Sequence, residues 1–219
     1  MAGFQSNAIS AQGVLIKVES GTLGATKVIT AITKAAQAVV SCAGHGFTLG
    51  QIVQFASVVG MVEINGLRGT VVAAPTDTFT VDIDSTGFTA YGSGGTAAPV
   101  VYVDLCEVKT FTGFDGQASE IDVTTICSDA KEVRLGLQDF GAFSFEMNYV
   151  PDDPGQMQMQ SAKASGVALA FRFVLPGTYG AWNFNAYVKA FPIAGGVDGV
   201  LTSSVSLRIS GAPTFVPGA

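Results

Sequence analysis

The last third of the chain alternates between apolar and polar side chains in four separate segments. In one of them, Phe143, Phe145 and Met147 fall on one face, while Ser144 and Glu146 fall on the other. The four segments are 140–149, 167–173, 182–189 and 201–209. A period of two residues is typical of a strand with one buried and one solvated face. The pattern therefore predicts a mainly β fold, built as a sandwich or as the wall of a barrel.

The same alternation predicts which side chains of the other three segments are buried. Their apolar faces hold Val167, Leu169, Phe171 and Phe173; Trp182, Phe184, Ala186 and Val188; and Leu201, Val205, Leu207 and Ile209. The opposite faces carry Asn, Ser, Lys and Arg side chains. We expect these opposite faces to meet water.

One short α-helix is predicted between Pro154 and Gly166. Asp153 is of a type that caps helix N-termini, proline suits the first helical position, and glycine suits the C-terminal stop. Its few apolar positions are Met157, Ala162 and Ala164. So sparse a stripe predicts a helix on the sheet edge rather than in a core.

The composition predicts a protein that associates. Only 13% of the residues are charged, whereas 48% are hydrophobic. A monomer with so few charges would expose much apolar surface, and burying that surface between copies is the simplest remedy. The alternative is a compact monomeric β-sandwich, since single exposed apolar residues are normal.

The net charge of −6 argues against a nucleic-acid-binding surface, which requires clusters of Lys and Arg. An acidic wall can still handle DNA by repelling it, so that a duplex slides without sticking. The segment 99–219 holds 12 acidic and 7 basic residues, whereas 27–98 holds 4 and 3. Most of the negative charge therefore lies in the first of these segments.

The sequence gives no sign of secretion or membrane insertion. Cys42, Cys106 and Cys127 are odd in number and lack CxxC spacing, so we expect buried or half-buried thiols of a reducing cytoplasm. Residues 1–10 lack a basic region followed by an apolar run, which predicts no signal peptide. No apolar stretch reaches the ~18 residues that span a bilayer.

Candidate catalytic and metal-binding groups are few, and we predict no enzyme, cofactor or metal site. His45 lies three residues from Cys42, but no third group orients the pair, so we interpret the histidine as the brace of a turn. Asp82 and Asp84 lack the further ligands of a calcium loop. The pair at 152–153 is better explained by helix capping.

The segment 27–98 is predicted to be an inserted small all-β domain. Strand candidates at 51–55, 69–73 and 78–83 are separated by Gly, Asn and Asp turns. The segment resembles the FCCH domain of ubiquitin-activating enzymes at Gly44-His45-Gly46-Phe47, Gly60-Met61, Asn65-Gly66, Phe79-Thr80, Gly87-Phe88 and Tyr91-Gly92. The resemblance implies a structural appendage with no ubiquitin chemistry.

The remainder, 1–26 with 99–219, carries a second resemblance. The relevant passages are EIDVTT at 120–125, KEVRLGLQDFG at 131–141, FEMNY at 145–149, PDDPGQMQ at 151–158 and FPIAGGVDGV at 191–200. Together they resemble the tail tube proteins of long-tailed, non-contractile, lambda-like bacteriophages. The resemblance implies a tail-tube β-sandwich or barrel-forming domain.

The resemblance also implies a function and partners. Such proteins form hexameric rings that stack into a tube through which DNA is delivered. It implies a virion protein assembled in the host cytoplasm, with itself, a tape measure protein and tail tip or terminator proteins as partners. Double-stranded DNA would pass through the lumen without specific binding, and no membrane is involved. The insertion would decorate the outside of the tube.

Two sets of residues are candidates for assembly. The polar faces of two strands would line the lumen through Ser144, Glu146, Asn148, Thr202, Ser204 and Ser206. The long loop from about 112 to 139 would reach the next ring through Asp115, Glu120, Asp122, Asp129, Lys131, Glu132 and Arg134. The alternatives are a polar face that simply meets solvent and a loop that is a disordered tip in the free subunit.

Two rival functions remain open. A tail terminator or head–tail joining protein would form a single ring without stacking. A non-viral carbohydrate-binding β-sandwich would need an aromatic platform on an exposed face, whereas most aromatic residues here fall on apolar faces.

Overall fold

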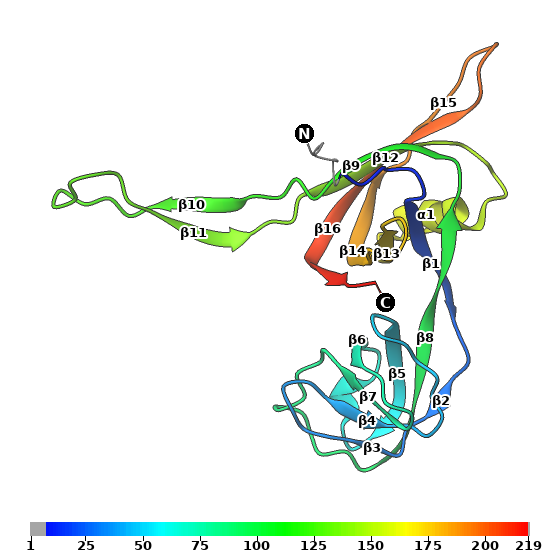
Figure 1. The fold of residues 1–219 in the computed structure, drawn as a ribbon, viewed down its shortest axis with the longest axis vertical. Helices are drawn as coiled ribbons and strands as arrows, with labels where there is room; N and C mark the ends of the chain where they lie inside the picture. Colours follow the sequence, from blue (N-terminus) through cyan, green and yellow to red (C-terminus); the bar gives the residue numbers. More distant parts are fainter. Residues whose placement is uncertain (1–7, 219) are drawn as a thin grey trace, which may run out of the picture. The chain divides into compact units, whose positions relative to one another are not determined.

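The computed structural model describes residues 8–218 (Figure 1). Strands dominate these residues, together with a helix over Pro154–Ser165, which confirms the mainly β prediction. No helix of the described part is long and apolar enough to cross a membrane. Most of the segment examined for a signal peptide, residues 1–7, lies outside the described residues.

The chain divides into two compact units. Unit 1 comprises the residues up to Val18 and from Val103 onward, and unit 2 comprises Glu19–Tyr102. Strands β1 (Leu15–Leu23) and β8 (Ser93–Leu105) each contribute residues to both units. That 27–98 is an insertion with a separate role stays a prediction.

Unit 1 is built on an antiparallel sheet with the strand order β1-β13-β14-β16-β12-β9. Besides β1, this sheet contains β9 (Val108–Gly113), β12 (Ala142–Asn148), β13 (Leu169–Val174), β14 (Ala181–Ala190) and β16 (Thr202–Val216). One face of this sheet supplies a core rich in phenylalanine, in which Phe171 and Phe184 stack 5.6 Å apart.

The predicted alternation is confirmed in the strands of this sheet, except that Asn183, expected on a face that meets water, is buried. Phe143, Phe145 and Met147 are buried, while the residues between them are half-buried. The alternation was extended too far at two ends: Val167 and Leu201 are exposed. Each precedes its strand, because β13 begins at Leu169 and β16 at Thr202, so neither has a core-facing position.

The predicted helix forms as α1 (Pro154–Ser165) with the predicted caps. The Asp153 carboxylate accepts a hydrogen bond from the Gln156 N–H at 2.8 Å, and Gly166 ends the helix with φ +70°. The expectation of a helix outside the core was wrong. Met159 is fully buried in the core of unit 1, whereas Met157 is exposed, because the inward face follows Gln156 at i+3.

Unit 2 contains antiparallel strands in the order β3-β4-β7-β6-β5-β8. Its elements are β2 (Lys27–Val28), β3 (Ala31–Ile32), β4 (Val39–Ser41), β5 (Ile52–Val59), a 3-10 turn η1 (Val62–Ile64), β6 (Arg68–Ala73) and β7 (Thr78–Val81). The three predicted strands are thus found as β5, β6 and β7. Its own core centres on Phe55 and Phe79.

Two hairpins of unit 1 complete the fold (Figure 1). The first, here called the arm, runs from Asp115 to Asp139 and pairs β10 (Ala118–Asp122) with β11 (Val133–Gln138). The predicted long loop thus contains a two-stranded hairpin, because the backbones of its two segments hydrogen-bond to each other. The second, here called the short hairpin, pairs β15 (Ile193–Ala194) with the start of β16.

Candidate functional site

The six predicted lumen residues lie together on the solvent face of the unit 1 sheet. They form three cross-strand pairs between β12 and β16: Ser144 with Ser206, Glu146 with Ser204, and Asn148 with Thr202. Strand β9 extends the same polar face, since Thr112 pairs with Ser144 and Thr110 with Glu146. A shallow hollow follows these three strands. The structure therefore joins the candidates into one surface, whose position in an assembly stays a prediction.

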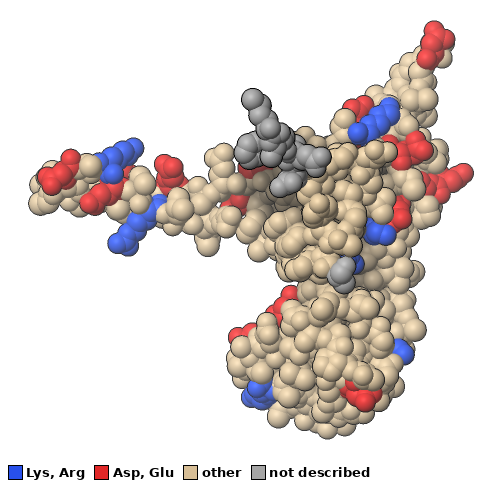
Figure 2. All heavy atoms as spheres, viewed as in Figure 1, with Lys and Arg blue, Asp and Glu red and all other residues tan. Residues whose placement is uncertain are grey.

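This polar face is nearly neutral rather than strongly acidic. Among the six paired residues, Glu146 alone carries a charge. On the same side of β16, the Arg208 guanidinium forms an ion pair with Asp139. Six of the twelve acidic residues between 99 and 219 instead lie on the arm, where red and blue alternate in Figure 2.

The predicted inter-ring residues all lie on the arm. On the described part of the chain its two strands pair only with each other. The register places Glu120 opposite Leu135 and Asp122 opposite Val133, so one face combines an acidic strand with an apolar strand. Leu135 is 72% exposed and Leu137 93% exposed. Side chains of this kind in water favour a partner surface.

Polar contacts order the arm between its two strands. Asp122 accepts hydrogen bonds from the backbone and hydroxyl of Thr124, which lower the pKa of that carboxyl. Lys131 lies 3.8 Å from the same carboxylate. Both interactions are exposed, so they shape the tip and contribute little to stability.

The root of the arm is fixed to the core by residues that sequence reasoning missed. Phe114 has φ +59°, a strained value for a non-glycine residue, and its ring contacts Phe143 and Phe184 at centroid distances of 5.4 Å. Asp139 accepts a hydrogen bond from the Gly141 N–H and pairs with Arg208, and both lower the pKa of its carboxyl. The run FTGFDG at 111–116 was the available signal, because glycines flank an aromatic residue there.

The histidine and the cysteines do not form a reactive centre. His45 braces its turn: Nδ1 accepts from the Phe47 N–H at 2.9 Å, and Nε2 lies 2.6 Å from the Pro75 carbonyl. Burial raises the pKa of the Cys42 thiol, which leaves less thiolate to act as a nucleophile. Cys106 and Cys127 are exposed, contrary to the prediction of buried thiols, because both lie in turns.

The carboxylates considered for calcium bind backbone groups instead. Asp82 accepts a hydrogen bond from the Thr70 N–H, and Asp84 accepts from the N–H and hydroxyl of Thr86. Over the described residues, no three His, Cys, Asp or Glu side chains come close enough to hold a metal ion.

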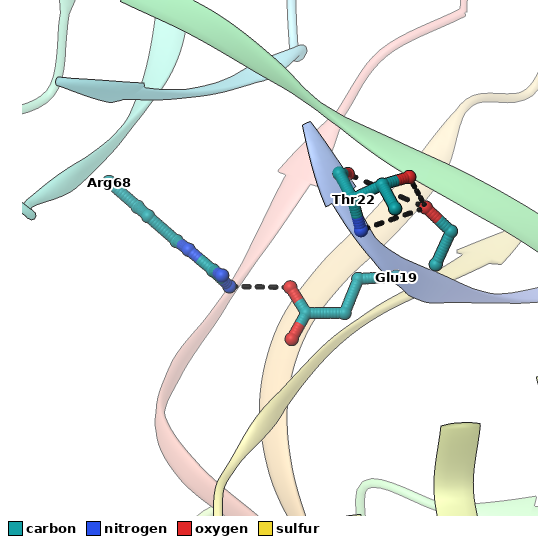
Figure 3. Close-up of polar contacts among 4 residues, drawn as sticks. Glu19, Thr22 and Arg68 are labelled. Carbon is teal, nitrogen blue, oxygen red and sulfur yellow. Dashed lines mark hydrogen bonds and ion pairs between the residues drawn. The ribbon is translucent and has the colours of Figure 1, made fainter. Parts of the chain in front are cut away.

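Unit 2 contains one ion pair that the sequence did not indicate. Glu19 on β1 is 4% exposed, and its carboxylate lies 2.5 Å from the guanidinium of Arg68 on β6 (Figure 3). Next to Glu19, the hydroxyls of Ser20 and Thr22 are 2.8 Å apart. A buried carboxylate requires such a partner, so this pair ties the end of β1 to the β6 strand.

Comparisons with known proteins give two family matches. Residues 83–173 match the lambda-like phage tail tube family, and residues 35–100 match the FCCH domain of ubiquitin-activating enzyme E1. "Structural protein 3" of Pseudomonas phage PAJU2 is 23% identical over 131 residues, covering 50% of this chain and 80% of the relative.

Solved structures are similar at lower levels. One chain in the tail of an empty gene transfer agent particle, refined with C6 symmetry, has a TM-score of 0.45 at 16% identity. The match covers 52% of this chain and 86% of that one. A chain of the sixfold-symmetrised anti-feeding prophage baseplate has a TM-score of 0.44 at 9% identity, covering 78% and 95%.

Both resemblances predicted from the sequence are thereby confirmed. The chain is similar to structural proteins of phage tails, and similarity of this kind favours a structural role over an enzymatic one.

Proposed function

We propose that the chain is the tube-forming subunit of a long, non-contractile phage tail, in which hexameric rings stack into a conduit for double-stranded DNA. The observation that carries the proposal is the sheet of unit 1, with a phenylalanine core on one face and paired hydroxyl, amide and carboxylate groups on the other. In this proposal the virion tail is the site of action, and the protein catalyses no reaction.

The sheet has an edge that a ring would remove. Strand β9 is the last in the order of unit 1, so its outer backbone groups face no strand of the described chain. Unpaired edges are prone to uncontrolled pairing, and closing a sheet through neighbouring copies eliminates them. Ring formation is therefore a physical solution for this sheet.

The polar face suits a wall along which DNA slides. Strong binding to DNA comes from cations that neutralise phosphates, and the six paired residues contain none. Arg208, which is close to them on β16, is already neutralised by Asp139. We therefore propose Ser144, Glu146, Asn148, Thr202, Ser204 and Ser206 as lumen residues.

The arm is proposed as the contact between stacked rings. Its apolar strand and its acidic strand share one face, so docking would bury Leu135 and leave room for charge pairing by Glu120. An isolated two-stranded hairpin is marginally stable in water, so contact with a second copy would also stabilise the arm itself.

The insertion is proposed to decorate the outside of the tube. The core of unit 2 is built from residues between Ile29 and Ala97, so the insertion does not need the rest of the chain to bury apolar surface. Deleting 27–98 and joining its ends with a short Gly-Ser linker should leave tube formation intact, as measured by filament length in electron micrographs. A deletion variant that folds but never polymerises would show that the insertion takes part in assembly.

The decisive test is negative-stain electron microscopy of the purified protein over a range of concentrations. Hollow filaments with a regular axial repeat are expected. Single rings that never stack would favour a terminator or joining protein instead. If monomers persist, adding preassembled tail tips and tape measure protein would distinguish a subunit that needs an initiator from a protein that does not form tubes.

A further inference from the structure

The tip of the short hairpin exposes apolar side chains that its local structure does not require. The Gly199 N–H donates to the Gly196 carbonyl, which closes a turn with Val197 and Asp198 at its centre. Turn centres favour Gly, Asn, Asp, Ser or Pro, and a β-branched valine gains nothing there. Val197 is 103% exposed and Val200 65% exposed, and both meet water in the free subunit.

A complementary surface lies beside the base of the same hairpin. An open pocket of about 350 Å³ is lined by Gln160, Lys163 and Ala164 at the end of α1, and by Phe191 and Ile193 before and within β15. The lining is largely apolar, with a single ammonium group. Lys163 forms no ion pair with any described residue.

The tip cannot fill this pocket in its own chain. Val197 lies four residues beyond Ile193, which is part of the pocket wall, and four residues of extended chain span about 13 Å. The pairing of Ile193 with Ser203 directs the hairpin away from its base. A tip that enters such a pocket must therefore belong to another copy.

We propose that the turn 196–199 of one copy docks in the pocket beside α1 of a second copy. Val197 and Val200 would enter the apolar part, and the Asp198 carboxylate would pair with Lys163. Tip and pocket are different patches, so the contact is head-to-tail, the type that generates rings or helical stacks rather than closed dimers. This inference rests on the proposed self-association, and it names a contact separate from the arm.

Charge reversal tests the pairing. Asp198→Lys and Lys163→Asp should each raise the concentration for half-maximal assembly about tenfold, because each places like charges together. The double variant should recover most of the loss. Asp152→Lys, an equal change of charge at another exposed turn, is the matched control and should have no effect. Equal effects of the control and of Asp198→Lys, or a double variant worse than both singles, would overturn the proposal.

Disulfide trapping tests whether the tip contacts the pocket of another copy, even when assembly is weak. In a background with the exposed Cys106 and Cys127 changed to Ser, a Val197→Cys copy is mixed with an Ala164→Cys copy under mild oxidation. We expect disulfide-linked dimers to form faster in the mixture than in either variant alone, because only the mixture brings tip and pocket thiols together.

The two tests separate this inference from the proposed function. If tubes form but no mixed dimer is trapped, the tip–pocket contact is wrong and tube formation stands. If the mixed dimer is trapped but the wild-type protein never forms rings or tubes, even with tail tips present, the contact stands and the tube function fails.

Discussion

Unit 1 and unit 2 are both antiparallel β structures with phenylalanine-rich cores, but they differ in where they leave apolar side chains. In unit 2 the most exposed aliphatic residue, Val28, is 69% exposed. In unit 1, Ile126 on the arm and Val197 on the short hairpin are fully exposed. Burial of apolar surface stabilises by roughly 25 cal/mol per Å². Unit 1 therefore leaves exposed apolar surface whose burial would stabilise an association.

The charges show the same contrast. Unit 2 pairs its nearly buried Glu19 with Arg68, an interaction internal to the unit. Unit 1 places acidic residues such as Glu120 and Asp198 on its hairpins. Neither of these two carboxylates forms an ion pair within the described residues, whereas Asp139 at the root of the arm pairs with Arg208. We expect the two units to have different tasks, and single substitutions can test this expectation.

The largest difference between the two units is expected when an exposed apolar residue in each is replaced by aspartate. Leu135→Asp should abolish stacking of rings into filaments, because docking of the arm would bury an unpaired charge. Val28→Asp in unit 2 is the matched control and should leave filaments intact. Filament length in electron micrographs measures both variants. Circular dichroism should show unchanged folding, since both side chains are exposed in the wild type.

The contrast between the units is contradicted if Val28→Asp blocks stacking as strongly as Leu135→Asp. If neither substitution changes filament length, the arm is not the contact between rings.

A truncation in one core should lower the stability of its own unit without changing that of the other. Phe143 and Phe79 are both fully buried, so truncation of either to Ala should cost about 3–5 kcal/mol of unfolding free energy. Phe79→Ala should lower the melting temperature of unit 2 alone and leave tube formation unchanged. Phe143→Ala should lower that of unit 1 and reduce assembly. Calorimetry resolves the transitions, and a single transition that shifts equally in both variants would refute independent units.

The smallest effect is expected at the root of the arm on acidification. The pKa of Asp139 is lowered by the Gly141 N–H and by Arg208, so its contacts stabilise the root above the ordinary pKa of aspartate. That contribution is lost as the pH falls through the lowered pKa. The protection of the Gly141 amide against hydrogen exchange, taken relative to the intrinsic rate at each pH, should fall over this range, and Asp139→Asn should remove this pH-dependent loss. Asp152→Asn serves as the control, and identical profiles of the wild type and Asp139→Asn would show that Asp139 does not stabilise the root of the arm.

Local patterns in the sequence were reliable guides to single elements. The alternation around Phe145 predicted β12, and the Asp153-Pro154 pair with Gly166 predicted both ends of α1. These succeed because strand periodicity and helix capping involve neighbours within a few residues. The same local reasoning chose Met157 as the apolar position of the helix, whereas the buried methionine is Met159. Which side of a helix faces the core is decided by what packs against it.

The sequence predicted which residues belong to the candidate site but not how they are arranged. Ser144 and Ser206 were both expected on polar faces, yet their pairing depends on the register between β12 and β16. The arm was expected as a long loop and its pairing was not predicted, because nothing within 118–122 indicates a partner at 133–138. Phe114 was missed because its positive φ is imposed by the aromatic cluster around it.

The β class, the alternating faces and the capped helix could be predicted from the sequence, because each depends on residues close together along the chain, and the resemblance to tail tube proteins was visible there as well. The tertiary structure was needed to show that Arg208 pairs with Asp139, that Glu19 pairs with Arg68, and that a valine-tipped hairpin has an apolar pocket beside its base. Those contacts join residues far apart in the chain, and long-range pairing is fixed by strand register and core packing rather than by local pattern.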